Sequence, residues 1–202
     1  MPIRRTISVQ WDAPSRRYRM ASSGRFVARS EVVKTVDLIV SDTETYLQKL
    51  SRDFTDGRIS LSDWQSAFAA RLRAGHTLSA AIALGGKENV SVREWGRIGA
   101  FMREQYKYLQ RFAIQIESGG KINFGRVNLY ARALRNTFLN AERLRMKKGQ
   151  KARWKLNARE SCTGLGSCTE QASRGVQRVI NFPLFGTRTC IHNCKCELEL
   201  ID

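Results

Sequence analysis

The hydrophobic positions of the chain follow two different periods, and the first thirty residues show the shorter one. The segment 7–11 alternates apolar and polar side chains, as a half-buried strand does. The segments 18–20 and 25–27 are similar, and they flank residues 21–24, where a glycine suits a tight turn. We expect residues 1–29 to form an extended arm that ends in a small hairpin and gains order by lying on a neighbour.

From residue 30 to residue 149 the period becomes helical. Apolar side chains recur at spacings of three, four and seven residues, which places them along one stripe of each helix. Ser91 and Glu94 have the spacing of a capping box, in which each side chain satisfies an amide at a helix start. Gly75 indicates the end of one helix in this segment. The pattern predicts antiparallel helices at 30–55, 60–75, 77–84, 91–118 and 124–148.

Beyond residue 149 the composition changes again. All five cysteines lie after residue 160, turn-forming residues become frequent, and 176–182 and 197–201 have the character of short strands. The sequence therefore predicts a mainly α protein in three parts. These are a basic N-terminal arm or hairpin over 1–29, an antiparallel helical body over 30–149, and a small Cys-rich α+β element over 150–202.

The apolar content also bears on location. The chain has no run of eighteen apolar residues, and no apolar stretch follows the basic residues at its N-terminus. We therefore expect neither a membrane span nor a signal peptide, and we expect synthesis in the cytoplasm.

Charge adds a binding hypothesis to this fold. The 202 residues include 35 Lys and Arg against 18 Asp and Glu, a formal net charge of +17. Such an excess favours a polyanionic neighbour, which is either nucleic acid or an acidic protein surface. The arm has six arginines against Asp12, and the segment 126–159 has eleven basic residues against one acid, Glu142.

The segment 126–159 suits phosphate contacts, which need positive charge but no reading of the base sequence. No recognisable base-reading motif accompanies it. The alternative is a solvated helix face that keeps the protein soluble, although such a face normally mixes both signs. We predict that the segment binds nucleic acid through Arg135, Arg143, Arg145, Lys147, Lys148, Lys151 and Arg153.

The cysteines favour a metal site. Four thiolates that arrive as two close pairs can complete a tetrahedral zinc site, which stabilises a small element with little apolar area. Their spacing is not that of a standard zinc finger. Disulfides that form outside the reducing cell, and free buried thiols, are the alternatives. The predicted zinc ligands are Cys162, Cys168, Cys194 and Cys196, with Cys190 and His192 as substitutes.

The residues offer little support for an enzyme. A catalytic cysteine needs a base, and the chain has two histidines. His76 lies in a helical region far along the chain from the cysteines, and His192 lies among the predicted ligands. No Ser-His-Asp set, glycine-rich phosphate loop or spaced carboxylate motif stands out. We therefore predict a protein that is not an enzyme and has no catalytic residues.

The C-terminal third resembles a known family. An arginine-rich helix with spaced alanines is followed by Trp154, by Glu160-Ser161-Cys162, by a second cysteine and Gly175, and by Asn193-Cys194-Lys195-Cys196-Glu197-Leu198. Over residues 125–200 this order is similar to the Mu F-like minor head proteins, or head morphogenesis proteins, of tailed bacteriophages. Members end in a Cys-x2-Cys element and a His-Pro-Asn-Cys-Arg-Cys-like element. Here the first pair is spaced Cys-x5-Cys, and Ile191-His192 stands where the family often has His-Pro.

The resemblance implies a structural protein of the virion, present in several copies in the head near the portal vertex. There it would assist head assembly and DNA packaging or ejection. The implied partners are the portal protein or the major capsid protein, and packaged double-stranded DNA bound by non-specific phosphate contacts. A stand-alone nucleic-acid-binding protein with a zinc ribbon-like element is the alternative. An effector or nuclease is the third hypothesis, but no remaining segment is large enough to supply a second, active domain.

Overall fold

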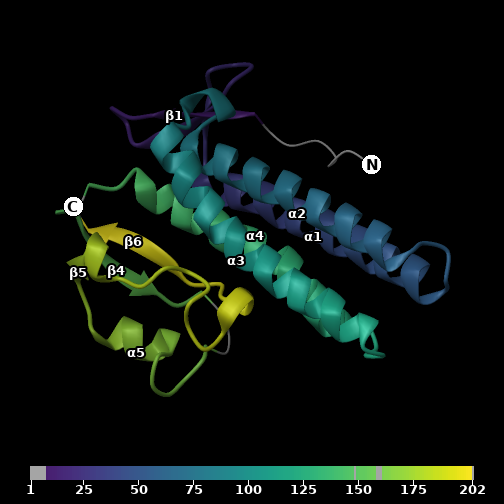
Figure 1. The fold of residues 1–202 in the computed structure, drawn as a ribbon. Coiled ribbons are helices and arrows are strands. Elements are labelled where there is room, and N and C mark those ends of the chain that lie inside the picture. The colour runs from purple at the N-terminus through teal and green to yellow at the C-terminus, as the bar shows by residue number, and fades with distance from the viewer. Residues whose placement is uncertain (1–7, 148, 158–160, 202) are drawn as a thin grey trace.

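A computed structural model describes residues 8–147, 149–157 and 161–201 of the chain. Four long helices lie side by side in Figure 1 and make up the predicted helical body: α1 (Arg29–Thr55), α2 (Leu61–Leu84), α3 (Val92–Glu117) and α4 (Phe124–Leu144). Helix α4 contacts the other three, and a short 3₁₀ turn, η1 (Lys87–Asn89), joins α2 to α3. The predicted mainly α class is confirmed.

Local sequence signals explain where most of these helices begin and end. Ser60 accepts a hydrogen bond from the backbone N–H of Asp63, and Ser91 and Glu94 form the predicted capping box. Gly85 ends α2 in the left-handed conformation, with φ 81°. Helix α4 ends at Leu144, before the predicted end at residue 148, because the chain turns there toward the next strand.

Gly75 does not end a helix, so the predicted division into helices 60–75 and 77–84 is wrong. Helix α2 runs through Gly75 without a break. A Cβ atom at this position would lie 2.3 Å from Cδ2 of Leu134, a fully buried residue of α4. The glycine is therefore required by the close approach of α2 to α4, a tertiary contact that has no signature in the local sequence.

The N-terminal residues form a three-stranded antiparallel sheet, with the order β1 (Val9–Asp12), β2 (Arg17–Met20) and β3 (Phe26–Val27). The predicted hairpin is confirmed, whereas residues 1–7 of the predicted arm lie outside the described residues. The described part is not extended, since the sheet lies on the helical body at the end where α2 stops (Figure 1). The neighbour on which the predicted arm lies is therefore the helical body of its own chain.

A buried carboxylate holds this sheet in place. The Tyr18 hydroxyl donates to Oε1 of Glu142 at 2.9 Å and lies 3.1 Å from the carbonyl of Ala83. Arg29 and Arg145 also donate to the Glu142 carboxylate, which is 5 % exposed. Burial, and the adjacent Glu142 carboxylate, raise the pKa of Tyr18 well above its usual value. Residues far apart in the sequence are thus joined by one charged cluster.

The C-terminal element is a second three-stranded antiparallel sheet with one short helix. Strand β4 (Lys151–Lys155) lies between β5 (Gln177–Arg178) and β6 (Glu197–Ile201), and α5 (Cys168–Ser173) follows β4 in the chain. The strand predicted at 197–201 is confirmed. The segment 176–182 is a strand only at 177–178, because the chain then enters the 3₁₀ turn η2 (Val179–Asn181), where the carbonyl of Val179 accepts from Arg143 of α4.

One hydrophobic cluster runs through all three predicted parts of the chain. It includes Tyr18 of the N-terminal sheet, Trp64 and Phe138 of the helical body, and Trp154 and Phe185 of the C-terminal element. The ring of Trp154 stacks on that of Phe185, with 4.7 Å between centroids. Within the described ranges, no helix has the length and apolar character needed to cross a bilayer.

The tight contact at Gly75 leads to a test of stability. We expect Gly75→Ala to destabilise the protein by about 1–3 kcal/mol, because the added Cβ meets Leu134 and this outweighs the better helix propensity of alanine. Gly99→Ala in α3 is the matched control, since its Cβ meets open space. Urea unfolding curves measure both. Equal effects of the two substitutions would contradict the packing argument.

Candidate metal centre and basic surface

The five cysteines converge on one place in the C-terminal element. Ser167 caps α5 by accepting from the N–H of Glu170, and so fixes Cys168 at the start of that helix. Cys190 precedes the 3₁₀ turn η3 (Ile191–Asn193), and Cys194 and Cys196 come between this turn and β6. Helix α4 anchors η3, since Asn136 donates to the carbonyl of Ile191. The cap of α5 and the contact of η3 with α4 therefore position the thiols together.

The sulfur atoms have the spacing of a metal-thiolate site. In a tetrahedral site with metal–sulfur bonds of about 2.3 Å, neighbouring sulfurs are roughly 3.8 Å apart. The Sγ of Cys168 lies 3.5 Å from that of Cys190 and 3.7 Å from that of Cys194. The Sγ atoms of Cys168, Cys194 and Cys196 all lie within 4.8 Å of one another, and all three residues are buried. The cluster could hold a metal ion.

The protonation of the thiols is uneven. The Cys194 thiol donates to Cys196 and lowers the pKa of Cys196 to about 6, against the opposing effect of burial. The same hydrogen bond, together with burial, raises the pKa of Cys194. Burial also raises the pKa of Cys168. A bound cation would stabilise the deprotonated form of the thiols whose pKa burial raises.

The structure brings three of the four predicted ligands together in one group and places the fourth in an adjoining group. Cys168, Cys194 and Cys196 share one group, whereas Cys162 lies in a second group with Cys168 and Cys190. Cys190, predicted as a substitute, interacts with both Cys168 and Cys194, while Cys162 accepts a hydrogen bond from the backbone N–H of Cys168 at 3.0 Å. All five are free thiols. Cys190 therefore fits better than Cys162 as the fourth ligand.

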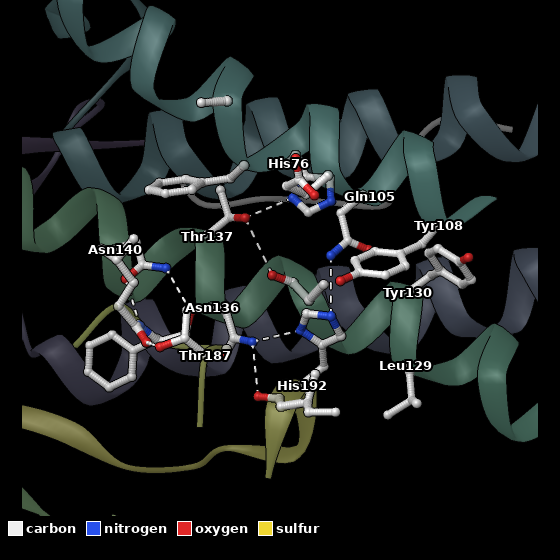
Figure 2. Close-up of a pocket in the computed structure, with 18 of the residues that line it drawn as sticks. His76, Gln105, Tyr108, Leu129, Tyr130, Asn136, Thr137, Asn140, Thr187 and His192 are labelled. Carbon is white, nitrogen blue, oxygen red and sulfur yellow. Dashed lines mark hydrogen bonds between the residues drawn. The ribbon is translucent and has the colours of Figure 1, made fainter. Parts of the chain in front are cut away.

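His192, the other predicted substitute, is turned away from the thiols. Its Nδ1 lies 2.9 Å from Nδ2 of Asn136 and its Nε2 lies 3.2 Å from the side-chain amide of Gln105. His76, which is distant in the sequence, lines the same cavity (Figure 2). The packing of α2 against α4 brings His76 toward the C-terminal segment.

The predicted nucleic-acid-binding arginines of α4 are engaged inside the protein. Arg143 donates to the carbonyls of Val179 and Pro183. The guanidinium of Arg145 lies 3.6 Å from the ring centroid of Trp11, and its side chain is 13 % exposed. Arg135 forms an ion pair with Asp37. Arg143 therefore satisfies loop carbonyls, and Arg145 donates to the buried Glu142 carboxylate.

The exposed part of the predicted basic surface lies at β4 and the preceding loop. Lys147 and Lys151 are exposed, and Lys148 lies outside the described residues. Strand β4 alternates exposed and buried residues, so Lys151, Arg153 and Lys155 share its outer face. Arg153 pairs with Glu199 of β6, and Lys155 lies 3.9 Å from both Glu197 and Glu199. Among the described residues of the predicted nucleic-acid-binding set, Lys147, Lys151 and Arg153 are thus the ones exposed to solvent.

Comparison with known proteins identifies no relative of this chain. No protein family profile, no curated protein and no solved structure matches the chain.

The cluster geometry predicts which thiols hold metal. We expect Cys190→Ser and Cys194→Ser each to abolish stoichiometric metal, as measured by elemental analysis of the purified full chain, because each removes one corner of the tetrahedron. Cys162→Ser is the matched control and should retain the metal. If Cys162→Ser loses the metal and Cys190→Ser retains it, the ligand set predicted from the sequence is supported instead.

Burial of His76 predicts a dependence of stability on pH. Desolvation lowers the pKa of His76 to about 4 from its usual 6.5. As the pH falls through 6.5, the unfolded chain takes up a proton that the folded protein does not, so stability is lost between pH 6.5 and 4. The loss attributable to this residue is about 3 kcal/mol. Denaturant unfolding of the wild type and of His76→Gln across this pH range measures the loss of stability. An identical dependence of the unfolding free energy on pH in the two proteins would contradict the prediction.

Proposed function

We propose that this chain is a structural minor head protein of a tailed bacteriophage, located in the virion head near the portal vertex. It assists head assembly and DNA packaging or ejection there, and it has no enzymatic role. Its partners are the portal protein or the major capsid protein, and the packaged DNA. The resemblance over residues 125–200 motivates this proposal, and the geometry of the C-terminal element gives the resemblance a physical basis.

The observation that carries the proposal is the set of contacts made by residues 193–198. Asn193 accepts a hydrogen bond from Arg132 of α4 at 2.7 Å, Cys194 and Cys196 enter the thiol cluster, and Leu198 is buried. The residues that carry the family resemblance are thus the ones that fasten the C-terminal element to the helical body. A fastened, compact element suits a protein that must hold its shape within an assembly.

We further propose that the metal is zinc, held by Cys168, Cys190, Cys194 and Cys196. A set of four thiolates favours zinc or an iron–sulfur cluster over hard cations such as magnesium. Four protein ligands leave no open coordination position, so the zinc would stabilise the fold and would not activate water. This role agrees with a structural function.

The DNA contact is assigned to the outer face of β4 and the loop before it. Lys147 and Lys151 present charge to solvent there, and Arg153 is exposed although it pairs with Glu199, whereas Arg143 and Arg145 are committed to internal contacts. Phosphate contacts made by such residues do not read sequence, which suits packaged DNA of any composition. A stand-alone nucleic-acid-binding protein with a zinc ribbon-like element would use the same surface, and it is the alternative.

The location of the protein distinguishes the proposed head function from that of a stand-alone nucleic-acid-binding protein. We expect mass spectrometry of purified virions to find the chain in a fixed ratio to the portal protein, because a head component is built into every particle. A free regulatory protein would be found in infected cells and not in particles. Absence from mature virions would exclude the head function and favour the alternative.

Salt dependence tests the DNA contact. We expect the isolated chain to bind duplex DNA weakly, and the triple variant Lys147→Gln, Lys151→Gln, Arg153→Gln to reduce the slope of log K against log salt by roughly 0.9 for each phosphate that is no longer neutralised. The control replaces Lys49, Arg52 and Arg58 by glutamine, at or just after the C-terminal end of α1 and away from β4. Equal reductions in both variants would show that binding is not localised to β4.

A further inference from the structure

The proposed zinc site uses four of the five cysteines and leaves Cys162 without a role. The structure nevertheless places this side chain against the cluster. The Sγ atoms of Cys162, Cys168 and Cys190 all lie within 4.8 Å of one another. The same is true of Cys168, Cys194 and Cys196, so Cys168 belongs to both groups. The five sulfurs therefore form two adjoining triangles with a common corner.

Hydrogen bonds hold Cys162 in this position. Its Sγ accepts from the backbone N–H of Cys168 at 3.0 Å, and its carbonyl accepts from the N–H and the hydroxyl of Thr169 at 3.3 and 3.0 Å. Gly164, with φ 90°, allows the intervening loop to turn back so that its two ends meet. Hydrogen bonds to sulfur also orient thiolate ligands in metal sites. The loop therefore presents the sulfur of Cys162 to the cluster.

Cys168 and Cys190 have the positions of bridging ligands. Their Sγ atoms are 3.5 Å apart, a little less than the roughly 3.8 Å expected in an isolated tetrahedral site. Cys190 interacts with Cys162 on one side and with Cys194 on the other, so it contacts both groups. A thiolate sulfur can bind two metal ions at once. Two tetrahedra that share the edge between Cys168 and Cys190 would therefore use all five sulfurs.

The balance of charge favours two ions over one. One divalent ion bound by four thiolates leaves two negative charges uncompensated, whereas two such ions bound by five thiolates leave one. Uncompensated charge is costly here because Cys168, Cys194 and Cys196 are buried. In the part of the chain that the structure describes, neither group includes a carboxylate or an imidazole. A donor set of thiolates alone selects soft ions such as zinc.

The two groups differ in their access to solvent. All three cysteines of the group with Cys194 and Cys196 are buried, whereas Cys162 and Cys190 are partly exposed. An ion bound by Cys162, Cys168 and Cys190 has three protein sulfurs, and its fourth coordination position is left to water or another external donor. This outer ion would therefore exchange more readily than the buried one.

We propose that the five cysteines form a dinuclear thiolate centre, in which Cys162, Cys168 and Cys190 bind a second zinc ion. Cys168 and Cys190 bridge this outer ion to the buried ion, which Cys194 and Cys196 also bind. The inference rests on the zinc site of the proposed function, to which it adds one ion and one ligand.

The metal content of the full chain tests the number of ions. The reduced protein is reconstituted with zinc, freed of unbound metal and measured by elemental analysis. We expect two zinc ions per chain in the wild type and one in Cys162→Ser, because only the outer ion depends on that sulfur. Thr163→Ala is the matched control and should bind two, since Thr163 is exposed and outside both groups. Circular dichroism verifies the folding of each variant.

The possible results separate this inference from the zinc site on which it rests. One ion in the wild type would refute the second ion and leave the buried zinc site standing, whereas no metal would refute both. Two ions in folded Cys162→Ser would place the second ion elsewhere and refute its assignment.

Cadmium nuclear magnetic resonance tests the bridging sulfurs. Cadmium replaces zinc at thiolate sites, and two cadmium nuclei that share a sulfur ligand split each other's resonance. We expect two mutually split resonances in the wild type and a single unsplit resonance in Cys162→Ser. A single resonance in the wild type, or two resonances without splitting, would overturn the dinuclear centre.

Discussion

The burial of one stretch of α4 on every side is the constraint on which the rest of the structure depends. Its residues are buried without interruption from 136 to 142, which is about two helical turns, so no face remains for solvent. The polar side chains in that stretch must find partners in other elements. Asn136 binds the carbonyl of Ile191, Asn140 binds the backbone of Phe185, and Glu142 binds Tyr18 and Arg29. These bonds fasten both sheets to the bundle.

The same constraint divides the basic residues into two groups, one with internal contacts and one exposed to solvent. Arginines that project from α4 meet neighbouring elements, so their guanidinium groups satisfy loop carbonyls and carboxylates, as Arg143 and Arg135 do. Lysines and arginines beyond the end of α4 lie on the loop and on the outer face of β4, where Lys147 and Lys151 reach solvent. A basic run in the sequence therefore combines internal stabilisation with an exposed surface for an anionic partner.

The thiol cluster and the polar cavity lie on opposite sides of one short turn. Residues 190, 194 and 196 point their sulfurs toward Cys168, whereas His192, between them in the sequence, points toward Gln105 and Asn136. Metal bound by the thiols would hold η3 in place, and through it the imidazole of His192. The thiol cluster and the polar cavity thus share one positioning element, which the α4 residue Asn136 holds through the carbonyl of Ile191.

The sequence by itself determined the helix periods, the capping box at Ser91, the N-terminal hairpin and the clustering of cysteines, because these depend on interactions within a few residues. Only the tertiary structure decided that Gly75 lies inside α2, that Cys168, Cys194 and Cys196 form one buried group, and that His76 and His192 line one cavity. Those outcomes depend on which helix faces approach each other. That approach is set by packing between distant segments, which leaves no pattern in either segment alone.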